Sequence, residues 1–181
     1  MKALILIDLQ NDYFEGGAME LAHAEKASEK AQQLLQQFRK ESLPIVHIQH
    51  IATRPEAGFF LPGTSGAEIH RNVQPGANEK IIVKHSPNSF QGTELLTYLQ
   101  ESRITDLVIC GMMTHMCVDS TTRAAKDFGF ACTVIADACA TKSLKIQGQL
   151  IQAQDVHNSF LAALNYYYAT VKTTKEYVAD K

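Results

Sequence analysis

The chain has 181 residues, 20% of them charged, and a formal net charge of −2. This near-neutral balance, with no basic tract, argues against nucleic acid and anionic membranes as main partners. The length fits a single domain over residues 1–181, and no apolar stretch approaches the about 18–20 residues of a membrane span.

The chain begins with an apolar run that ends at an aspartate. The run "ALILI" (3–7) stops at Asp8, which makes it too short for the apolar region of about 7–15 residues in a signal peptide. The run therefore predicts a buried strand. Without a signal peptide, we expect a cytoplasmic protein. The four cysteines form no C-x-x-C pair, so we expect reduced thiols and no cysteine-bound zinc.

Apolar runs and segments of helical period alternate along the rest of the chain. Continuous apolar runs are typical of strands that are buried on both faces, as in a parallel sheet. The alternation therefore predicts an α/β protein, a three-layer α/β/α sandwich with a mostly parallel sheet. The strands are expected at residues 3–7, 44–48, 81–83, 107–110, 132–136 and 169–171, and the helices at 22–39, 93–100, 117–128 and 153–165.

One long segment between two expected strands has neither the apolar run of a strand nor the apolar period of a helix. Residues 52–68 contain two adjacent phenylalanines, and loops of this length in compact domains are usually functional or disordered. Because of the phenylalanines, we expect this segment to form a pocket wall or an interface.

Polar side chains follow three of the expected strands. Asp8 follows the first, Lys84 the third, and Cys117 lies in the turn after the fourth. In an open α/β sheet, ligands bind outside the carboxyl ends of the strands. The spacing therefore predicts that a carboxylate, an ammonium and a thiol meet at one edge of the sheet.

These three groups suit nucleophilic catalysis. The start of a helix lowers the pKa of a cysteine, the lysine stabilises the thiolate, and a desolvated carboxylate takes the thiol proton. The sulfur then attacks a carbonyl and forms a thioester that water opens. Three structural alternatives stay open: a turn residue at Asp8, an exposed Lys84 and a core residue at Cys117.

Three segments also resemble one family. They are "LILIDLQNDYF" (4–14), "VKHSPNSF" (83–90) and "ICGMMTHMCVDST" (109–121), and they resemble the isochorismatase-like cysteine hydrolases, which include nicotinamidases and N-carbamoylsarcosine amidase. The resemblance extends over roughly residues 3–172. It implies a Rossmann-like sheet of six strands and a catalytic triad of Asp8, Lys84 and Cys117. It also implies a cis peptide between Met112 and Met113, which aims the N–H groups of Met113 and Cys117 at an oxyanion.

The sequence departs from the metal site of nicotinamidases. His50, Ala52 and Phe59 stand where that family pattern has an aspartate and two histidines. His47, His50 and His70 do not form a metal-binding motif, and the odd spacing of the first two places them on opposite faces of a strand. We therefore expect no metal and no cofactor.

The substrate expectation comes from a closer resemblance. The segments "ATRP…FFLPGT" and "CGMMTHMCVDST" resemble those of the nicotinamidase-related group that includes streptothricin hydrolase, which opens a lactam. We expect hydrolysis of a C–N bond in a small amide, lactam or ureido substrate. Two alternatives are a non-catalytic ligand-binding member of the fold and a nicotinamidase without the usual metal site.

The expected substrate pocket is apolar. His115 is expected to provide a hydrogen bond, or else to cap a helix or face a neighbouring subunit. Ordinary core packing is the alternative for each phenylalanine. The resemblance also implies a homodimer or a larger homo-oligomer, and "NYYYATV" (165–171) is expected in an interface or in the core. The pocket walls are expected from Phe14, Phe59, Phe60, Phe90, Met112 and Met113.

Overall fold

A parallel sheet forms the centre of the protein. The computed structural model describes residues 1–179, apart from the side chain of Pro55. Six parallel strands are arranged in the order β3-β2-β1-β4-β5-β8, which confirms the predicted fold class. The strands are β1 (Lys2–Ile7), β2 (Ile45–His50), β3 (Lys80–Lys84), β4 (Asp106–Met112), β5 (Ala131–Ala140) and β8 (Thr170–Lys172).

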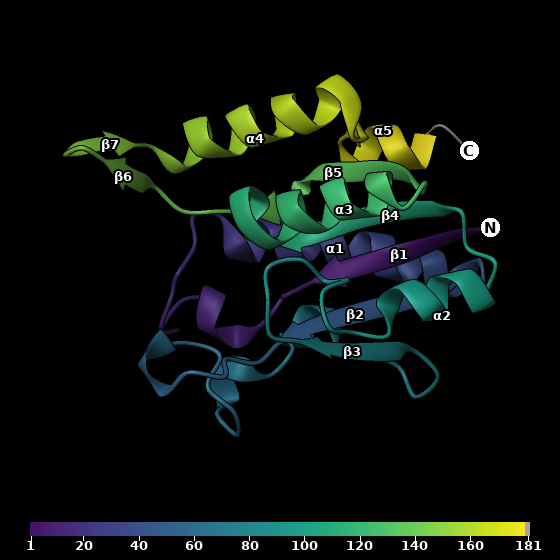
Figure 1. Ribbon diagram of the computed structural model, residues 1–181, viewed down its shortest axis with the longest axis horizontal. Helices are drawn as coiled ribbons and strands as arrows, with labels where there is room; N and C mark the ends of the chain where they lie inside the picture. The colour runs from purple at the N-terminus through teal and green to yellow at the C-terminus, as the bar shows by residue number, and fades with distance from the viewer. Residues whose placement is uncertain (180–181) are drawn as a thin grey trace.

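Helices cover both faces of this sheet (Figure 1). One face is covered by α1 (Ala24–Lys40), with α5 (Thr174–Ala179) beside it, and the other by α2 (Leu95–Glu101) and α3 (Asp119–Asp127). The remaining long helix, α4 (Ala153–Tyr167), packs beside α3 and β8. Among residues 1–179, no helix has the length and apolar character needed to cross a membrane.

The apolar patterns explain these layers. Every residue of β1 from Ala3 to Ile7 is at most 2% exposed, because helices cover both of its faces. The helix α1 buries a single apolar stripe against the sheet, as its period predicts. That stripe consists of Ala24, Ala27, Ala31, Leu34, Leu35 and Phe38.

A hairpin and the last helix were not predicted from the sequence. A hairpin of β6 (Leu144–Ile146) and β7 (Gln149–Ile151) projects at the left of Figure 1. Its turn has φ of 49° at Gln147 and 80° at Gly148, the left-handed pair that favours two-residue hairpins. The helix α5 was also missed. Its first residue, Thr174, is held by the carboxylate of Asp137, which accepts hydrogen bonds from the Thr174 N–H at 2.7 Å and from the Thr174 hydroxyl at 2.8 Å.

The aromatic segment near the C-terminus divides into two parts, because Tyr168, Ala169 and Val171 pack against the core whereas Tyr166 and Tyr167 are exposed. Tyr166 is 92% exposed and Tyr167 is 66% exposed, so the core alternative is wrong for these two residues. Their rings lie on the outer face of α4. An interface role for this segment stays a prediction.

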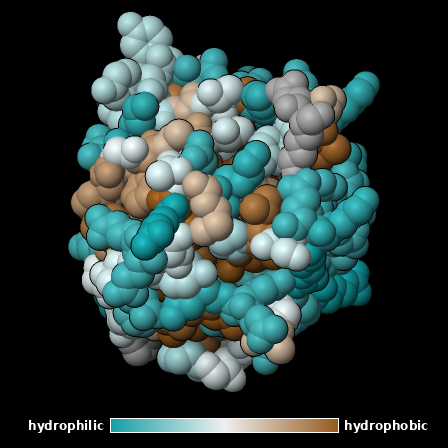
Figure 2. Space-filling view, turned by 90° about the vertical axis from the view of Figure 1, so that its right-hand side faces the viewer, coloured by the Kyte–Doolittle hydropathy of each residue, from teal (hydrophilic) through white to brown (hydrophobic). Residues whose placement is uncertain are grey.

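The long segment between β2 and β3 lies at the end of the sheet where the strands finish. It shares this end with the β6–β7 hairpin (Figure 1). A hydrogen bond of 2.6 Å from Phe60 N–H to Asp12 Oδ2 ties the segment to the loop after β1. Figure 2 shows the opposite end of the sheet, whose surface is mostly hydrophilic with small apolar patches.

A glycine allows the two central strands to approach closely. Gly111 has φ of 129°, and a Cβ at this position would lie 2.0 Å from the carbonyl oxygen of Ile7, the residue before Asp8. We expect Gly111→Ala to lower the free energy of unfolding by about 3 kcal/mol or more, because backbone strain and a backbone clash add. Chemical denaturation measures the loss.

Gly129 provides the matched control for that substitution. Its φ is 91°, but a Cβ there would meet no heavy atom within 4 Å. Gly129→Ala should therefore lower the free energy of unfolding by only roughly 1–2 kcal/mol, which is the cost of placing an alanine in a left-handed backbone conformation. Equal losses in the two variants would contradict the close approach of β1 and β4.

Candidate active site

The sheet topology brings the three predicted residues to one edge. Asp8 directly follows β1, Lys84 is the last residue of β3, and Cys117 lies in the helical turn Thr114–Val118 after β4. At Asp8 the chain turns with φ of 49°, and its N–H still donates to the carbonyl of Ile48 at 3.0 Å. Parallel strands end at the same edge, so these three side chains converge there.

Lys84 is at the centre of the resulting cluster. Its Nζ lies 2.8 Å from Asp8 Oδ2 and 3.3 Å from Cys117 Sγ. It also lies 3.0 Å from His50 Nδ1 and 3.0 Å from the carbonyl oxygen of Ser86. Asp8 and Lys84 are 0% exposed and Cys117 is 5% exposed, which excludes the exposed alternative for the lysine.

The environment sets the charges of the cluster. Burial lowers the pKa of Lys84, but the neighbouring Asp8 carboxylate, together with the Cys117 sulfur when it is ionised, raises it more, so the pKa of Lys84 lies above its ordinary value and the side chain is an ammonium. Burial raises the pKa of the Cys117 thiol, Asp8 raises it further, and Lys84 only partly opposes them. The resting residue is therefore a thiol, and the expected lowering of its pKa by a helix start is wrong, because desolvation is the larger effect.

Asp8 keeps the capacity to accept a proton. Its buried carboxylate pairs with Lys84 Nζ at 2.8 Å. One of its oxygens lies within 4.8 Å of Cys117 Sγ, and the interaction between the two side chains raises the pKa of the thiol. The carboxylate thus lies close to the thiol.

The turn that carries Cys117 is fixed by backbone contacts. The peptide bond between Met112 and Met113 is cis. The carbonyl oxygen of Met113 accepts hydrogen bonds from the N–H groups of Met116 at 3.0 Å and Val118 at 3.3 Å. At the start of the turn, the Thr114 hydroxyl donates to the carbonyl oxygen of Ala140 at 3.2 Å. These contacts hold the turn against the ends of β4 and β5.

Two neighbours of the cluster were missed from the sequence. Gln10 clamps the backbone of His50, since its Nε2 donates to the His50 carbonyl at 2.8 Å and its Oε1 accepts from the His50 N–H at 2.7 Å. Tyr13 is buried, and burial, Cys117 and Asp8 together raise its pKa. Both residues belong to the segment "LQNDYF", which directly follows Asp8. Their closeness to Asp8 in the sequence was the signal that could have identified them.

Of the predicted pocket residues, two aromatic rings lie beside this cluster. Phe60 is buried, with its ring centroid 5.9 Å from His50 and 4.7 Å from Tyr13. Phe59 is half-buried and its ring lies 4.9 Å from that of Phe60. The phenylalanines of the long segment therefore pack next to the candidate site, together with the buried Met112 and Met113 at the turn.

The other three predicted pocket residues make different contacts. Phe14 stacks on His70 with ring centroids 3.6 Å apart. Phe90 packs against Phe128 at 5.2 Å and also against Phe130, where α3 ends and β5 begins. His115 pairs through Nδ1 with the hydroxyl of Thr141. None of these contacts reaches the cluster around Lys84, because Phe90 lies at the far end of α3 and His115 turns toward β5.

The cluster does not suit a metal ion. Within residues 1–179, the one group of three suitable side chains with ligand atoms within 4.8 Å of one another is Asp8, His50 and Cys117. Lys84 Nζ contacts all three, so an ammonium already occupies the centre of the ligand set. His47 and His70 do not complete a site, because His47 bonds Glu79 at 2.8 Å and His70 stacks on a phenylalanine.

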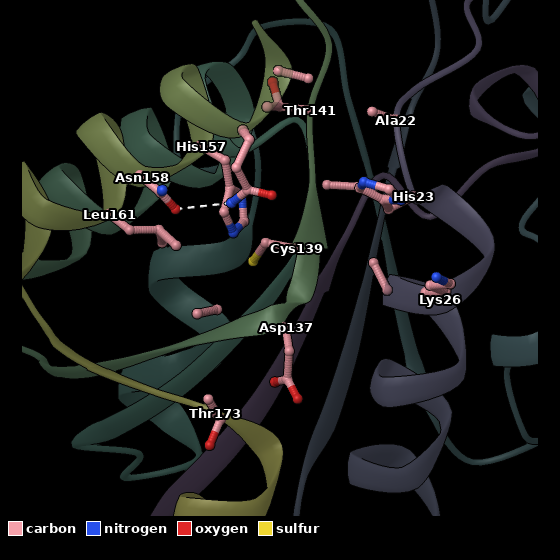
Figure 3. A pocket seen from close by; sticks show the side chains of 15 residues that line it. Ala22, His23, Lys26, Asp137, Cys139, Thr141, His157, Asn158, Leu161 and Thr173 are labelled. Atoms are coloured by element: carbon pink, nitrogen blue, oxygen red, sulfur yellow. Dashed lines mark hydrogen bonds between the residues drawn. The ribbon is translucent and has the colours of Figure 1, made fainter.

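A cavity of about 330 Å³ lies elsewhere, between the start of α1, the end of β5 and α4 (Figure 3). It is lined by His23, which directly precedes α1, by Lys26 of α1, by Cys139 of β5 and by His157 of α4. His157 Nδ1 lies 2.9 Å from the hydroxyl of Thr114, in the turn that carries the nucleophile candidate. No member of the Lys84 cluster lines this cavity.

This fold and this site define a family. The model of the isochorismatase domain matches residues 2–176, and the chain belongs to the isochorismatase family of hydrolases. It is 50% identical over 176 residues to the isochorismatase family protein YddQ of Bacillus subtilis, an alignment that covers 97% of this chain and 98% of the relative.

Two further relatives illustrate the range of similarity. A crystal structure from Oleispira antarctica, assigned to the isochorismatase hydrolases, has a TM-score of 0.95 and 46% identity and covers 98% of this chain and 96% of that one. Streptothricin hydrolase of Streptomyces noursei is 28% identical over 165 residues, which are 91% of this chain and 56% of the relative. The family is thus shown, and one of the proteins similar to this chain is named as a hydrolase of streptothricin.

Proposed function

We propose that this chain hydrolyses a C–N bond of a small amide, lactam or ureido substrate through a thioester on Cys117. The contact of Lys84 Nζ with both the Asp8 carboxylate at 2.8 Å and the Cys117 sulfur at 3.3 Å carries this proposal. Core packing alone does not require a nucleophile, a proton acceptor and a cation in mutual contact, whereas covalent catalysis does. The similarity to streptothricin hydrolase supports the choice of a C–N bond.

The first half of the reaction forms the thioester. Asp8 takes the thiol proton as Cys117 Sγ attacks the carbonyl carbon, so a C–S bond forms and the π electron pair moves to the oxygen. The N–H groups of Met113 and Cys117 donate to this oxyanion, and each such donor is worth about 2.7–4 kcal/mol in comparable sites. The C–N bond then breaks, and the leaving nitrogen takes the proton from Asp8.

The second half releases the acid. Water attacks the thioester carbon and gives a proton to Asp8, and the C–S bond breaks when the second tetrahedral intermediate collapses. The departing thiolate takes that proton back from Asp8, which restores the resting thiol and carboxylate. Lys84 stays an ammonium throughout, and its charge stabilises the thiolate each time it forms.

The test is turnover of a panel of small primary amides, lactams and N-carbamoyl compounds by wild type and Cys117→Ala, in the presence of a chelator. We expect ammonia or a new carboxylate from at least one compound class with wild type and none with the variant. Equal turnover by both proteins would contradict the proposal. Binding of these compounds without turnover by wild type would favour the ligand-binding alternative.

We also propose that the protein acts in the cytoplasm as a homodimer or a larger homo-oligomer. All four cysteines are free and buried, which suits a reducing compartment. The exposed rings of Tyr166 and Tyr167 suit a contact between copies. Sedimentation at micromolar concentration that gives only a 20.0 kDa species would contradict the assembly.

A further inference from the structure

His50 lies where the side chain of Lys84 crosses the sheet. Because β2 lies between β3 and β1, and neighbouring strands are about 4.8 Å apart, Lys84 must pass the end of β2 to reach Asp8. His50 is the last residue of β2 and pairs in register with Lys84. Its Nδ1 lies 3.0 Å from Lys84 Nζ, and Gln10 holds its backbone from the other side.

This contact fixes the tautomer of the imidazole. An ammonium has only donors, so Nδ1 of His50 must accept the hydrogen bond and cannot carry a proton. Burial and the charge of Lys84 lower the pKa of His50, while Asp8 only partly opposes them, so the ring is neutral. The single ring proton of a neutral imidazole with an unprotonated Nδ1 is on Nε2.

The Nε2–H group has no hydrogen-bond partner among the residues that the structure describes. Among residues 1–179 the hydrogen bonds of His50 involve its Nδ1, its backbone N–H and its carbonyl oxygen. The side chain is half-buried, whereas Asp8 and Lys84 are fully buried. His50 is thus the member of the cluster that is partly exposed and has an unused donor, and its ring lies next to that of Phe60.

We propose that His50 is a substrate-binding residue whose Nε2–H donates a hydrogen bond to an acceptor atom on the carbon beside the scissile carbonyl. This inference rests on the proposed function and narrows its substrate class to amides with an oxygen at that carbon, such as 2-hydroxy amides. The selectivity comes from the donor itself, because a substrate with an alkyl group there leaves the N–H unpaired on binding.

The test compares 2-hydroxyacetamide with propionamide, two amides of similar size that differ in the acceptor. Wild type should favour the hydroxy compound in kcat/KM by about tenfold, which is the value of one such hydrogen bond. His50→Phe should lose this preference. His85→Phe should keep it, since His85 is exposed and, within residues 1–179, its side-chain hydrogen bond is to the carbonyl of Ile51. If His50→Phe does not fold, His50→Leu makes the same test.

An unchanged preference in the His50 variant, or no preference in wild type, would overturn the inference. Binding of the two amides to Cys117→Ala and to Cys117→Ala/His50→Phe, measured by calorimetry, needs no turnover. A preference that is present in the first protein and absent in the second would support His50 as the donor even if the proposed hydrolysis failed. No preference in either protein would overturn the inference independently of the chemistry.

Discussion

Replacing Lys84 with methionine is expected to lower the free energy of unfolding by about 3–5 kcal/mol, because it leaves the buried Asp8 carboxylate without its counter-ion. Both side chains are 0% exposed and the two charges are 2.8 Å apart. The loss is large against a typical total stability of about 5–15 kcal/mol. Denaturation in urea measures it.

The double variant Asp8→Asn/Lys84→Met separates stability from catalysis. It removes both charges, and replacing a buried ion pair by neutral groups is often neutral for stability. We expect it to recover most of the stability that Lys84→Met loses but none of the hydrolase activity, because it lacks both the proton acceptor and the cation. A Lys84→Met protein as stable as wild type, or an active double variant, would contradict the described cluster.

Replacing Cys117 with alanine is expected to lower kcat/KM by about 10³-fold or more, since a substituted nucleophile leaves only the binding and oxyanion contributions. The same substitution should change the free energy of unfolding by less than about 2 kcal/mol, because it deletes a single sulfur atom. Initial rates on a compound that wild type turns over, together with chemical denaturation, measure both quantities.

Cys110 supplies the matched control for this variant. It lies in β4, is 0% exposed, and its pKa is raised mainly by burial. Cys110→Ala should cost stability by leaving a small cavity in the core and should leave kcat/KM within about threefold of wild type. Equal losses of activity in the two cysteine variants would argue that Cys117 acts through packing and not as a nucleophile.

Much of the fold could be predicted from the sequence because the central strands are buried on both faces. Runs such as "ALILI" (3–7) and "LVIC" (107–110) are continuous, and each lies in a strand of the parallel sheet. The convergence of Asp8, Lys84 and Cys117 followed from one topological rule, that parallel strands end at one edge. The pattern therefore predicted both the strands and the meeting of these residues.

The parts that could not be predicted depend on pairings distant in the sequence. The sequence suggests no role for His50 beyond that of a possible metal ligand, because its contact with Lys84 depends on the register of β2 against β3. The helix α5 begins at Thr174, whose partner Asp137 lies 37 residues earlier. The hairpin turn at Gln147 and Gly148 has a left-handed residue other than the asparagine or aspartate that usually signals such a turn.

The predicted pocket residues show a second limit of prediction from the sequence. Phe59 and Phe60 follow β2 and lie at the site edge, whereas Phe90 packs at the opposite end of α3. An aromatic residue in a loop is compatible with either place, and only the path of the loop decides. The position of Lys84 could be predicted, since a residue at the carboxyl end of a parallel strand must lie at that edge of the sheet.

The central claim is that Cys117 carries the acyl group during turnover. The most direct measurement is intact-mass analysis of wild-type protein quenched in acid during turnover of its best substrate, with peptide mapping of the modified residue. We predict a mass increase equal to the acyl group, located on Cys117 and absent from Cys117→Ala. Turnover without any adduct at Cys117, in wild type and the variant alike, would contradict the mechanism.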